Sequence, residues 1–144
     1  MALALDQARS GAAAGEVPVG AVLVNGATGE IVAAAHNLVE TRADPTAHAE
    51  MLVLRSGAAW SGAARLADCD LYVTLEPCPM CAQAVSFARL RRLYFGAYDP
   101  KGGGVDHGPR IFSQTTCHHA PEVIGGVNEI QCAELLKDFF RKKR

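Results

Sequence analysis

Two short stretches constrain this chain most, because their side chains make a recognisable ligand set only if the fold brings them together. The first contains His48 and, two residues later, Glu50. The second contains Cys78 and Cys81 at Cys-x-x-Cys spacing. One imidazole nitrogen and two thiolate sulfurs are ligands that suit zinc. The sequence therefore predicts a zinc site held by His48, Cys78 and Cys81.

The number of ligands indicates a catalytic zinc rather than a structural one. Structural zinc sites usually have four protein ligands, whereas catalytic sites keep three and leave one position for water. Only three ligands have local support here, and Glu50 places a carboxylate beside the imidazole. An open zinc with a nearby carboxylate is the arrangement that makes hydroxide at neutral pH. A thioredoxin-like redox pair also uses Cys-x-x-Cys after a strand, but His-x-Glu at a preceding helix start is not part of that chemistry.

Length and cysteine usage bound the class of protein. A chain of 144 residues suits a single domain over 1–144. Its five cysteines are too few and too irregular for a secreted disulfide scaffold, and a metal-binding Cys-x-x-Cys pair needs reduced thiols, so we expect a cytoplasmic protein. The N-terminus has no positive region and carries Asp6, which argues against a signal peptide. No apolar run reaches the roughly eighteen residues of a membrane span, so we expect no membrane partner.

Charge is concentrated at the C-terminus. Five basic residues and one acid lie between Lys137 and Arg144, so this end carries +4 and the rest of the chain −5. A basic end that also contains Phe139 and Phe140 is suited to contact a polyanion. On charge alone, the alternative is a solvated helix end whose cations interact favourably with the helix dipole.

Hydrophobic patterning predicts strands that alternate with helices, as in an α/β layered domain. Binding sites in such sheets lie at the carboxyl ends of strands. His48 and Cys78 each follow a predicted strand and begin a predicted helix, so one shared site is expected. The predicted elements are a helix over 2–14, a hairpin over 19–36, a helix over about 47–59, an irregular connection within 56–67, a strand over 70–75, a helix over about 79–88, a strand over 92–97, a long glycine-rich loop over 102–119, a short strand within 122–126 and a final helix after 128.

Capping residues set the expected helix starts. Asp44 or Thr46 is positioned to cap the helix that contains His48, and Pro79 suits the first position of the helix that contains Cys81. Asn128 is positioned to cap the final helix. The expected apolar face of that helix consists of Ile130, Leu135, Leu136 and Phe139.

With these residues in view, the chain resembles the cytidine deaminase superfamily and, within it, the bacterial tRNA-specific adenosine deaminases. His48-Ala49-Glu50 and Pro77-Cys78-Pro79-Met80-Cys81 match the His-x-Glu and Pro-Cys-x-x-Cys signature of zinc nucleobase deaminases. This signature marks the superfamily. The flanking sequence, together with the C-terminus that carries two phenylalanines and basic residues, indicates the tRNA branch. The flanking stretches are Glu16 to Val22, Asp44 to Glu50, Leu71 to Cys78, Phe95 to Ala97 and Leu135 to Arg141.

The resemblance implies the fold and the chemistry. The expected fold is a three-layer α/β/α domain around a mixed five-stranded sheet, with one zinc per chain and water or hydroxide as the fourth ligand. Hydroxide attacks C6 of adenine at the tRNA wobble position, ammonia leaves and inosine forms. Glu50 is not a ligand: it takes a proton from the water, donates to N1 and later protonates the departing amine. Helical spacing alone would not assign this role, because residues i and i+2 diverge by about 200° on an ideal helix.

The resemblance also implies substrate contacts and partners. A splayed base in a tRNA anticodon loop reaches a pocket without duplex opening. Family members are homodimers whose partner chain helps to form the RNA surface. At the matching positions are Asn37 and the backbone of Ala49 for the base, Asp99 and Lys101 for the flanking nucleotides, and Phe140, Lys143 and Arg144 for the anticodon loop. Judged on spacing alone, Asn37 would be a turn residue that satisfies its own backbone.

The segment 105–119 departs from the family. Family members often carry a Leu-x-His-Pro type segment and an Asn-His pair here. We expect His119 to correspond to the later His and Gln114 to replace a His that approaches the RNA. Cys117, His118 and His119 have no spaced partner, so we expect surface residues here rather than a second metal site. The departure leaves the zinc chemistry untouched and bears on the RNA contacts of the loop.

Two other functions stay open at this point. A deaminase of a free base or nucleoside, such as guanine or cytosine, would keep the four central residues but have no need of the aromatic and basic C-terminus. A non-catalytic, zinc-stabilised RNA-binding module would instead need a fourth protein ligand, such as Cys69 or Cys117, and would have no use for Glu50.

Overall fold

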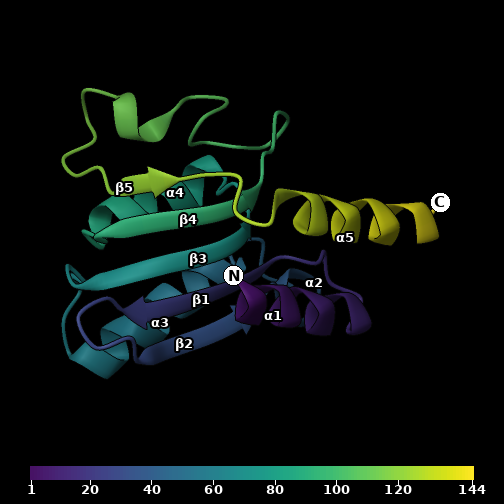
Figure 1. The fold of residues 1–144 in the computed structure, drawn as a ribbon, viewed down its shortest axis with the longest axis horizontal. Helices are drawn as coiled ribbons and strands as arrows, with labels where there is room; N and C mark the ends of the chain where they lie inside the picture. The colour runs from purple at the N-terminus through teal and green to yellow at the C-terminus, as the bar shows by residue number, and fades with distance from the viewer.

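The sheet is mixed and five-stranded, as predicted. The structure is a computed structural model that describes residues 1–144. The strands lie in the order β2-β1-β3-β4-β5 (Figure 1). β1 pairs antiparallel with both β2 and β3, whereas β3, β4 and β5 run parallel to one another. The bounds are β1 Gly20–Asn25, β2 Ile31–His36, β3 Cys69–Leu75, β4 Arg92–Ala97 and β5 Glu122–Ile124.

Helices cover both faces of the sheet, which confirms the predicted three layers. α1 (Ala2–Ala13) and α5 (Glu129–Lys142) lie on one face, and α3 (Ala49–Ser61) and α4 (Pro79–Phe87) lie behind the sheet on the other (Figure 1). α2 (Val39–Arg42) is a single turn between β2 and α3, and Ile111–Ser113 forms a 3₁₀ turn within the long loop. None of these helices has the length and apolar character needed to cross a membrane.

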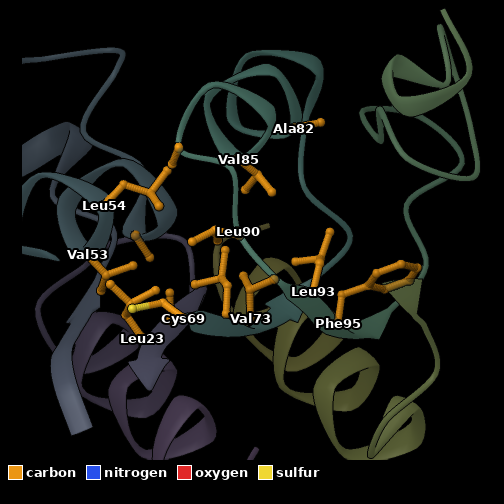
Figure 2. Packing of buried hydrophobic residues seen from close by; sticks show 14 of the residues in the cluster. Leu23, Val53, Leu54, Cys69, Val73, Ala82, Val85, Leu90, Leu93 and Phe95 are labelled. Atoms are coloured by element: carbon orange, nitrogen blue, oxygen red, sulfur yellow. The ribbon is translucent and has the colours of Figure 1, made fainter. Parts of the chain in front are cut away.

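The main core lies between the sheet and the α3–α4 layer. Figure 2 shows Val53 of α3 and Val85 of α4 directed toward Leu23, Val73 and Leu93 of the strands. All five side chains are fully buried. Burial of one such side chain stabilises a fold by about 1.5 to 3 kcal/mol. This packing fixes the starts of α3 and α4 relative to the ends of the strands, and those starts carry the predicted zinc ligands.

The opposite face is packed through small residues. In α1 the buried positions are Ala4, Leu5, Ala8 and Gly11, as the alanine-rich sequence suggests. A side chain at Gly20 of β1 would collide with the backbone of α1, and one at Gly96 of β4 would collide with Cys132 of α5. Glycine in these two strands therefore lets the two helices lie close to the sheet.

The start of α3 differs from the prediction. The helix begins at Ala49 rather than near 47, because His48 has extended backbone angles of φ −71° and ψ 149°. Neither Asp44 nor Thr46 caps it: Asp44 instead accepts hydrogen bonds from the backbone N–H and hydroxyl of Thr46, at 2.8 and 2.7 Å. The helix also runs to Ser61, so the first part of the predicted irregular connection is helical.

The start and the outer face of α5 also differ from the prediction. Asn128 precedes the helix with a left-handed φ of 54°, and its side chain donates to Gln131 instead of capping the backbone. Ile130 is 74% exposed, and Cys132 is the buried residue of this turn. Leu135 and Leu136 are half-buried, as expected for the inner face.

Candidate metal centre and active site

The three predicted zinc ligands converge in the structure. Their ligand atoms all lie within 4.8 Å of one another. Nδ1 of His48 is 3.6 Å from the Sγ of Cys78 and 3.5 Å from the Sγ of Cys81. In a tetrahedral zinc site with ordinary Zn–S and Zn–N bonds, nitrogen and sulfur ligands lie about 3.6 Å apart. The geometry of this side-chain cluster therefore fits zinc.

Local structure explains this convergence. His48 is the residue before α3, and Cys78 is the residue before α4, with Pro79 at the first helical position as predicted. Cys81 lies in the first turn of α4 and is fully buried. Free backbone N–H groups and the positive end of the helix dipole favour thiolates at such a helix start.

The two thiols of the cluster differ in how readily they ionise. Hydrogen bonds to its sulfur, from Cys81 first and from His48 next, lower the pKa of Cys78 to about 4 despite partial burial. The pKa of Cys81 is raised, because its thiol donates to Cys78 and is buried. Cys78 is therefore the thiol that ionises more readily, and Cys81 would release its proton when a metal binds.

No fourth protein ligand completes the cluster. The group of metal-ligating side chains contains only His48, Cys78 and Cys81. Cys69 is buried at the start of β3, and Cys117 lies beside the hydroxyl of Ser86 at 3.4 Å. A closed structural site, which a zinc-stabilised binding module would need, is therefore contradicted by the structure.

Glu50 is buried beside the ligands with one oxygen free. It is 3% exposed, and its Oε2 has no hydrogen-bond partner. Burial raises the pKa of Glu50 to about 7. Because His48 is extended and lies outside the helix, the divergence expected for residues i and i+2 of an ideal helix does not separate the two side chains. An orphaned carboxylate oxygen at this position indicates a polar group, such as water or substrate, that belongs in the site.

A pocket of about 340 Å³ opens in front of this cluster. Its polar lining includes Asn37, His48, Glu50, Cys78 and Asp99. Apolar walls with a few converging polar groups are typical of small-molecule sites. The apolar walls come from Val17, Val19, Val39 and Leu75.

Asn37 connects the pocket wall to α3. Its Oδ1 accepts the backbone N–H of Ala49 at 2.9 Å, and the residue is 8% exposed. This bond satisfies the first N–H of the helix, a function that sequence reasoning assigned to Asp44 or Thr46. Because the oxygen is occupied, Asn37 has its Nδ2 donor left for a ligand in the pocket. The N–H of Ala49 is already used by Asn37.

Two buried glutamates that the sequence reasoning did not single out also line the pocket. Glu16 accepts hydrogen bonds from the N–H and hydroxyl of Thr41, at 2.7 and 2.8 Å, and Glu76 accepts one from the N–H of Asp99 at 2.9 Å. Burial acts to raise each pKa, but these hydrogen bonds outweigh it and hold both pKa values below the usual range. Both glutamates lie shortly before a proline: Glu76 directly precedes Pro77 at the end of β3, and Glu16 lies two residues before Pro18 in the segment that leads into β1. This shared position is the sequence signal that could have drawn attention to them.

The residues expected to contact RNA lie along a continuous surface. Asp99 lines the pocket in front of the cluster and also an apolar pocket of about 660 Å³. Lys101 and Phe140 line that second pocket and a third, basic one of about 720 Å³. Lys143 and Arg144 complete the basic pocket. The structure thus brings all five side chains to one series of adjoining pockets.

The divergent loop is attached to α4 rather than wholly exposed. His119 directs Nε2 to the carbonyl oxygen of Leu90 at 2.7 Å, and the hydroxyl of Ser86 donates to the carbonyl of His119 at 2.6 Å. Cys117 is half-buried in the same contact, while His118 and Gln114 are exposed. The expectation of surface residues therefore holds for His118 and is wrong for Cys117 and His119, which are half-buried.

Comparison with known proteins agrees with this geometry. The family profile described as the cytidine and deoxycytidylate deaminase zinc-binding region matches residues 1–97. The chain is 56% identical to a tRNA-specific adenosine deaminase of Agrobacterium fabrum over 100% of this chain and 93% of that protein. It is 47% identical to the tRNA-specific adenosine deaminase of Bacillus subtilis over 98% and 86%.

A solved structure shares both sequence and fold. It comes from a study of A-to-I editing by tRNA:A34 deaminases at the wobble position of transfer RNA. The match has a TM-score of 0.91 and 55% identity, and it covers 94% of this chain and 97% of that one. The chain belongs to the tRNA-specific adenosine deaminase family, within the proteins that carry the cytidine and deoxycytidylate deaminase zinc-binding region.

Proposed function

We propose that residues 1–144 form one zinc-dependent deaminase domain that converts adenosine to inosine at the wobble position of a tRNA anticodon. One observation carries the proposal: the three-ligand cluster and the orphaned Glu50 face a pocket that adjoins a basic surface on α5. The first part fits hydrolytic deamination, and the second fits a polyanionic substrate.

His48, Cys78 and Cys81 would hold the metal. A zinc ion with three protein ligands supplies a Lewis acid that lowers the pKa of water toward neutrality. The two nitrogen–sulfur distances, 3.6 and 3.5 Å, fit this ion.

Glu50 moves the protons of the reaction. With a pKa near 7 it can both accept and donate a proton at neutral pH. It takes one proton from the attacking water and delivers it to N1 of adenine. The C6–O bond forms, the C6–N6 bond breaks, and Glu50 passes the remaining proton to the departing amine. The products, inosine and ammonia, balance adenosine and water.

Asn37 orients the base. Its Oδ1 is held by the N–H of Ala49, so Nδ2 is the group that can donate to an acceptor on the purine. Ala49 supports the base indirectly through this bond. The apolar walls of Val17, Val19 and Leu75 exclude water from the ring faces.

RNA rather than a free base is the substrate that the surface favours. Asp99 lies where the base pocket adjoins the apolar pocket, and Lys101 lies where the apolar pocket adjoins the basic one. We infer that both residues contact nucleotides that flank the target. Phe140, Lys143 and Arg144 form the aromatic and basic end that would contact the anticodon loop. Aromatic rings stack on unpaired bases, and cations neutralise phosphates. A free-base deaminase has no need of these groups.

A homodimer in the cytoplasm completes the proposal. The family resemblance supports the dimer, and Phe87 at the end of α4, which is 69% exposed, is an apolar side chain that an interface could cover. The reduced thiols of the zinc cluster and a tRNA substrate both fit the cytoplasm. Light scattering on the purified protein tests the oligomeric state.

A product assay on a panel of substrates tests the function. The panel contains an anticodon stem-loop with adenosine at the wobble position, free adenine, guanine and cytosine, and their nucleosides. We expect inosine in the RNA and no turnover of the small molecules. Turnover of a free base with inert RNA would refute the RNA assignment and favour the second type of deaminase.

A further inference from the structure

Glu76 is a fully buried carboxylate with no lysine or arginine partner. It follows β3, one residue before Pro77 and two before Cys78, and its side chain is 0% exposed. Its Oε2 accepts the backbone N–H of Asp99 at 2.9 Å and lies 2.8 Å from the Nδ1 of His107. A buried carboxylate needs several donors to offset its lost hydration. Here the donors come from the segment 99–107.

The other oxygen of Glu76 binds the far end of the same segment. Oε1 accepts three consecutive backbone N–H groups, from Val105, Asp106 and His107, at 3.2, 2.9 and 3.0 Å. Consecutive N–H groups that converge in this way form an anion-binding concavity. One carboxylate therefore joins both ends of the loop that begins at Asp99.

Glycine makes this close wrapping possible. A Cβ at Gly103 would lie 2.5 Å from the Oε1 of Glu76 and 2.5 Å from the carbonyl oxygen of Asp99. A Cβ at Gly104 would lie 2.6 Å from the backbone of Pro79. The N–H of Gly104 also donates to the carbonyl of Pro77 at 2.8 Å. The loop is thus seated on the chain that carries the zinc ligands, around the Glu76 carboxylate.

Only the tip of the loop lies outside this arrangement. The carboxylate of Asp99 accepts the N–H groups of Lys101 and Gly102, at 3.2 and 3.0 Å, so residues 99–102 form a tight turn. Asp99 and Gly102 line the base pocket, and Lys101 lines the basic pocket on α5. The turn is therefore the junction between the two surfaces that the RNA would occupy.

We propose that Glu76 is a positioning residue, whose carboxylate holds the Asp99–Gly102 turn where it aligns the nucleotides that flank the target adenosine. This inference rests on the proposed function and deepens it. Glu76 borders the base pocket, but both of its oxygens are already bound by donors of the 99–107 segment, so it acts on RNA alignment through the turn. Its effect therefore falls on RNA affinity and leaves zinc content and the chemical step in place.

Glu76→Gln tests this directly, with Glu30→Gln as the matched control. Gln keeps the shape but replaces one acceptor oxygen with an amide that faces N–H donors. Glu30 is exposed at the hairpin turn, at the opposite end of the strands from Glu76. We expect Glu76→Gln to weaken the Kd for the stem-loop by roughly tenfold to a hundredfold, with single-turnover rate at saturating RNA within about threefold of wild type. If Glu76→Gln lowers only the fraction of protein molecules that are active, and the active molecules bind the stem-loop with the wild-type Kd, then Glu76 has a merely structural role.

A double-mutant cycle separates positioning from an independent contribution. If Glu76 acts through the turn, the double variant with Glu76→Gln and Lys101→Ala should have about the same Kd for RNA as whichever single variant has the higher Kd. If instead the fold-change in Kd of the double variant equals the product of the two single fold-changes, the two residues act independently and the proposal is overturned.

Gly103→Ala reaches the same loop without changing any charge, so it keeps the test open if Glu76→Gln does not fold. Its methyl group would force the loop away from Glu76, and we expect the same pattern of weaker Kd and retained single-turnover rate. Wild-type RNA affinity in Gly103→Ala, like wild-type affinity in a folded Glu76→Gln, would contradict the proposal.

Amide hydrogen exchange gives a readout that needs no RNA. In Glu76→Gln the amides of Val105 and Asp106 should exchange at least about tenfold faster than in wild type, with Leu93 in β4 unchanged. Unchanged exchange in the loop would overturn the proposal even if wild type edits RNA. If wild type neither binds nor edits the stem-loop, the proposed function fails and the role in RNA alignment falls with it, whereas faster loop exchange would still show that Glu76 holds the turn.

Discussion

Asn37 has one observed contact and one proposed role, and two substitutions distinguish them. Its Oδ1 accepts the N–H of Ala49, and its Nδ2 is proposed to bind the base. Asn37→Ala removes both groups. Asn37→Asp keeps the acceptor oxygen and removes the donor. Helix stability and base recognition should therefore respond differently to the two changes.

The expected magnitudes follow from burial. Ala49 is 0% exposed, so Asn37→Ala leaves its N–H buried and unsatisfied at the start of α3. Such a loss costs about 1 to 3 kcal/mol, which corresponds to a Tm lower by roughly 3 to 10 °C for a domain of this size. Asn37→Asp should lose less than half of that stability. It should still lose roughly tenfold to a hundredfold in kcat/KM, because a donor to the base is replaced by an acceptor.

Thermal unfolding of the zinc-loaded variants and turnover of the stem-loop measure the two effects side by side. Zinc per chain is checked in each sample, so that loss of metal is not mistaken for loss of the hydrogen bond. If Asn37→Ala is as stable as wild type, the bond to Ala49 does not support α3. If Asn37→Asp is as active as wild type, Nδ2 is not the group that binds the base.

Three further predictions concern the metal, the C-terminus and acid stability. Cys81→Ser should abolish zinc binding and turnover, whereas Cys117→Ser should keep a full zinc content in a colorimetric assay; loss of zinc in both would contradict the three-ligand site. Truncation after Asp138 removes four basic residues, so it should weaken RNA binding and reduce the salt slope by up to about 3 without changing zinc content; an unchanged slope would refute the contact. The pKa of Glu16 lies below its ordinary 4.5 because the hydrogen bonds from Thr41 outweigh burial, so its contribution is present above that pH and is lost as the pH falls through the lower folded value. Urea unfolding should therefore show Glu16→Gln less stable than wild type by about 1 to 3 kcal/mol at pH 7, with a difference that shrinks as the pH falls below 4.5; a constant difference would contradict this.

The zinc cluster could be predicted because its signals are local. His48, Cys78 and Cys81 have side-chain chemistry that few other roles require, and each lies beside a recognisable helix start. Alternation of strands and helices then predicts that the ligands meet at the ends of the strands. The helices, the strands and the metal centre could therefore be predicted from patterns that span only a few residues each.

The start of α3 could not be predicted, because its partner is distant in sequence. Asn37 lies twelve positions before Ala49, and no local pattern links an amide after one strand to the first N–H of the next long helix. Asp44 and Thr46 look like caps but hydrogen-bond to each other.

The error at Ile130 has a different cause. Residues i and i+2 of a helix diverge by about 200°, so Ile130 and Cys132 lie on opposite sides of α5. Cys132 is buried on the side that also carries the half-buried Leu135 and Leu136, and Ile130 is on the exposed side. Cys132 lies against Gly96 instead, a contact that depends on the absence of a side chain in β4.

Glu16 and Glu76 show what pattern reasoning omits. Sequence patterns place carboxylates on the surface, because an unpaired buried charge is costly. Here each carboxylate is stabilised by backbone N–H groups of a segment remote in sequence, without a lysine or arginine side chain. Every residue except proline has a backbone N–H group, so no sequence pattern identifies the ones that bind a buried carboxylate.

Inosine formation in a stem-loop with wobble adenosine, measured in single turnover for wild type and Glu50→Gln at equal zinc content, tests the central claim most directly. Glu50→Gln keeps the buried shape and removes the proton acceptor. We expect wild type to form inosine and the variant to be slower by about 10² to 10⁴-fold at saturating RNA. A zinc-loaded wild type that forms no inosine, or a Glu50→Gln variant that matches it in rate, would contradict the account.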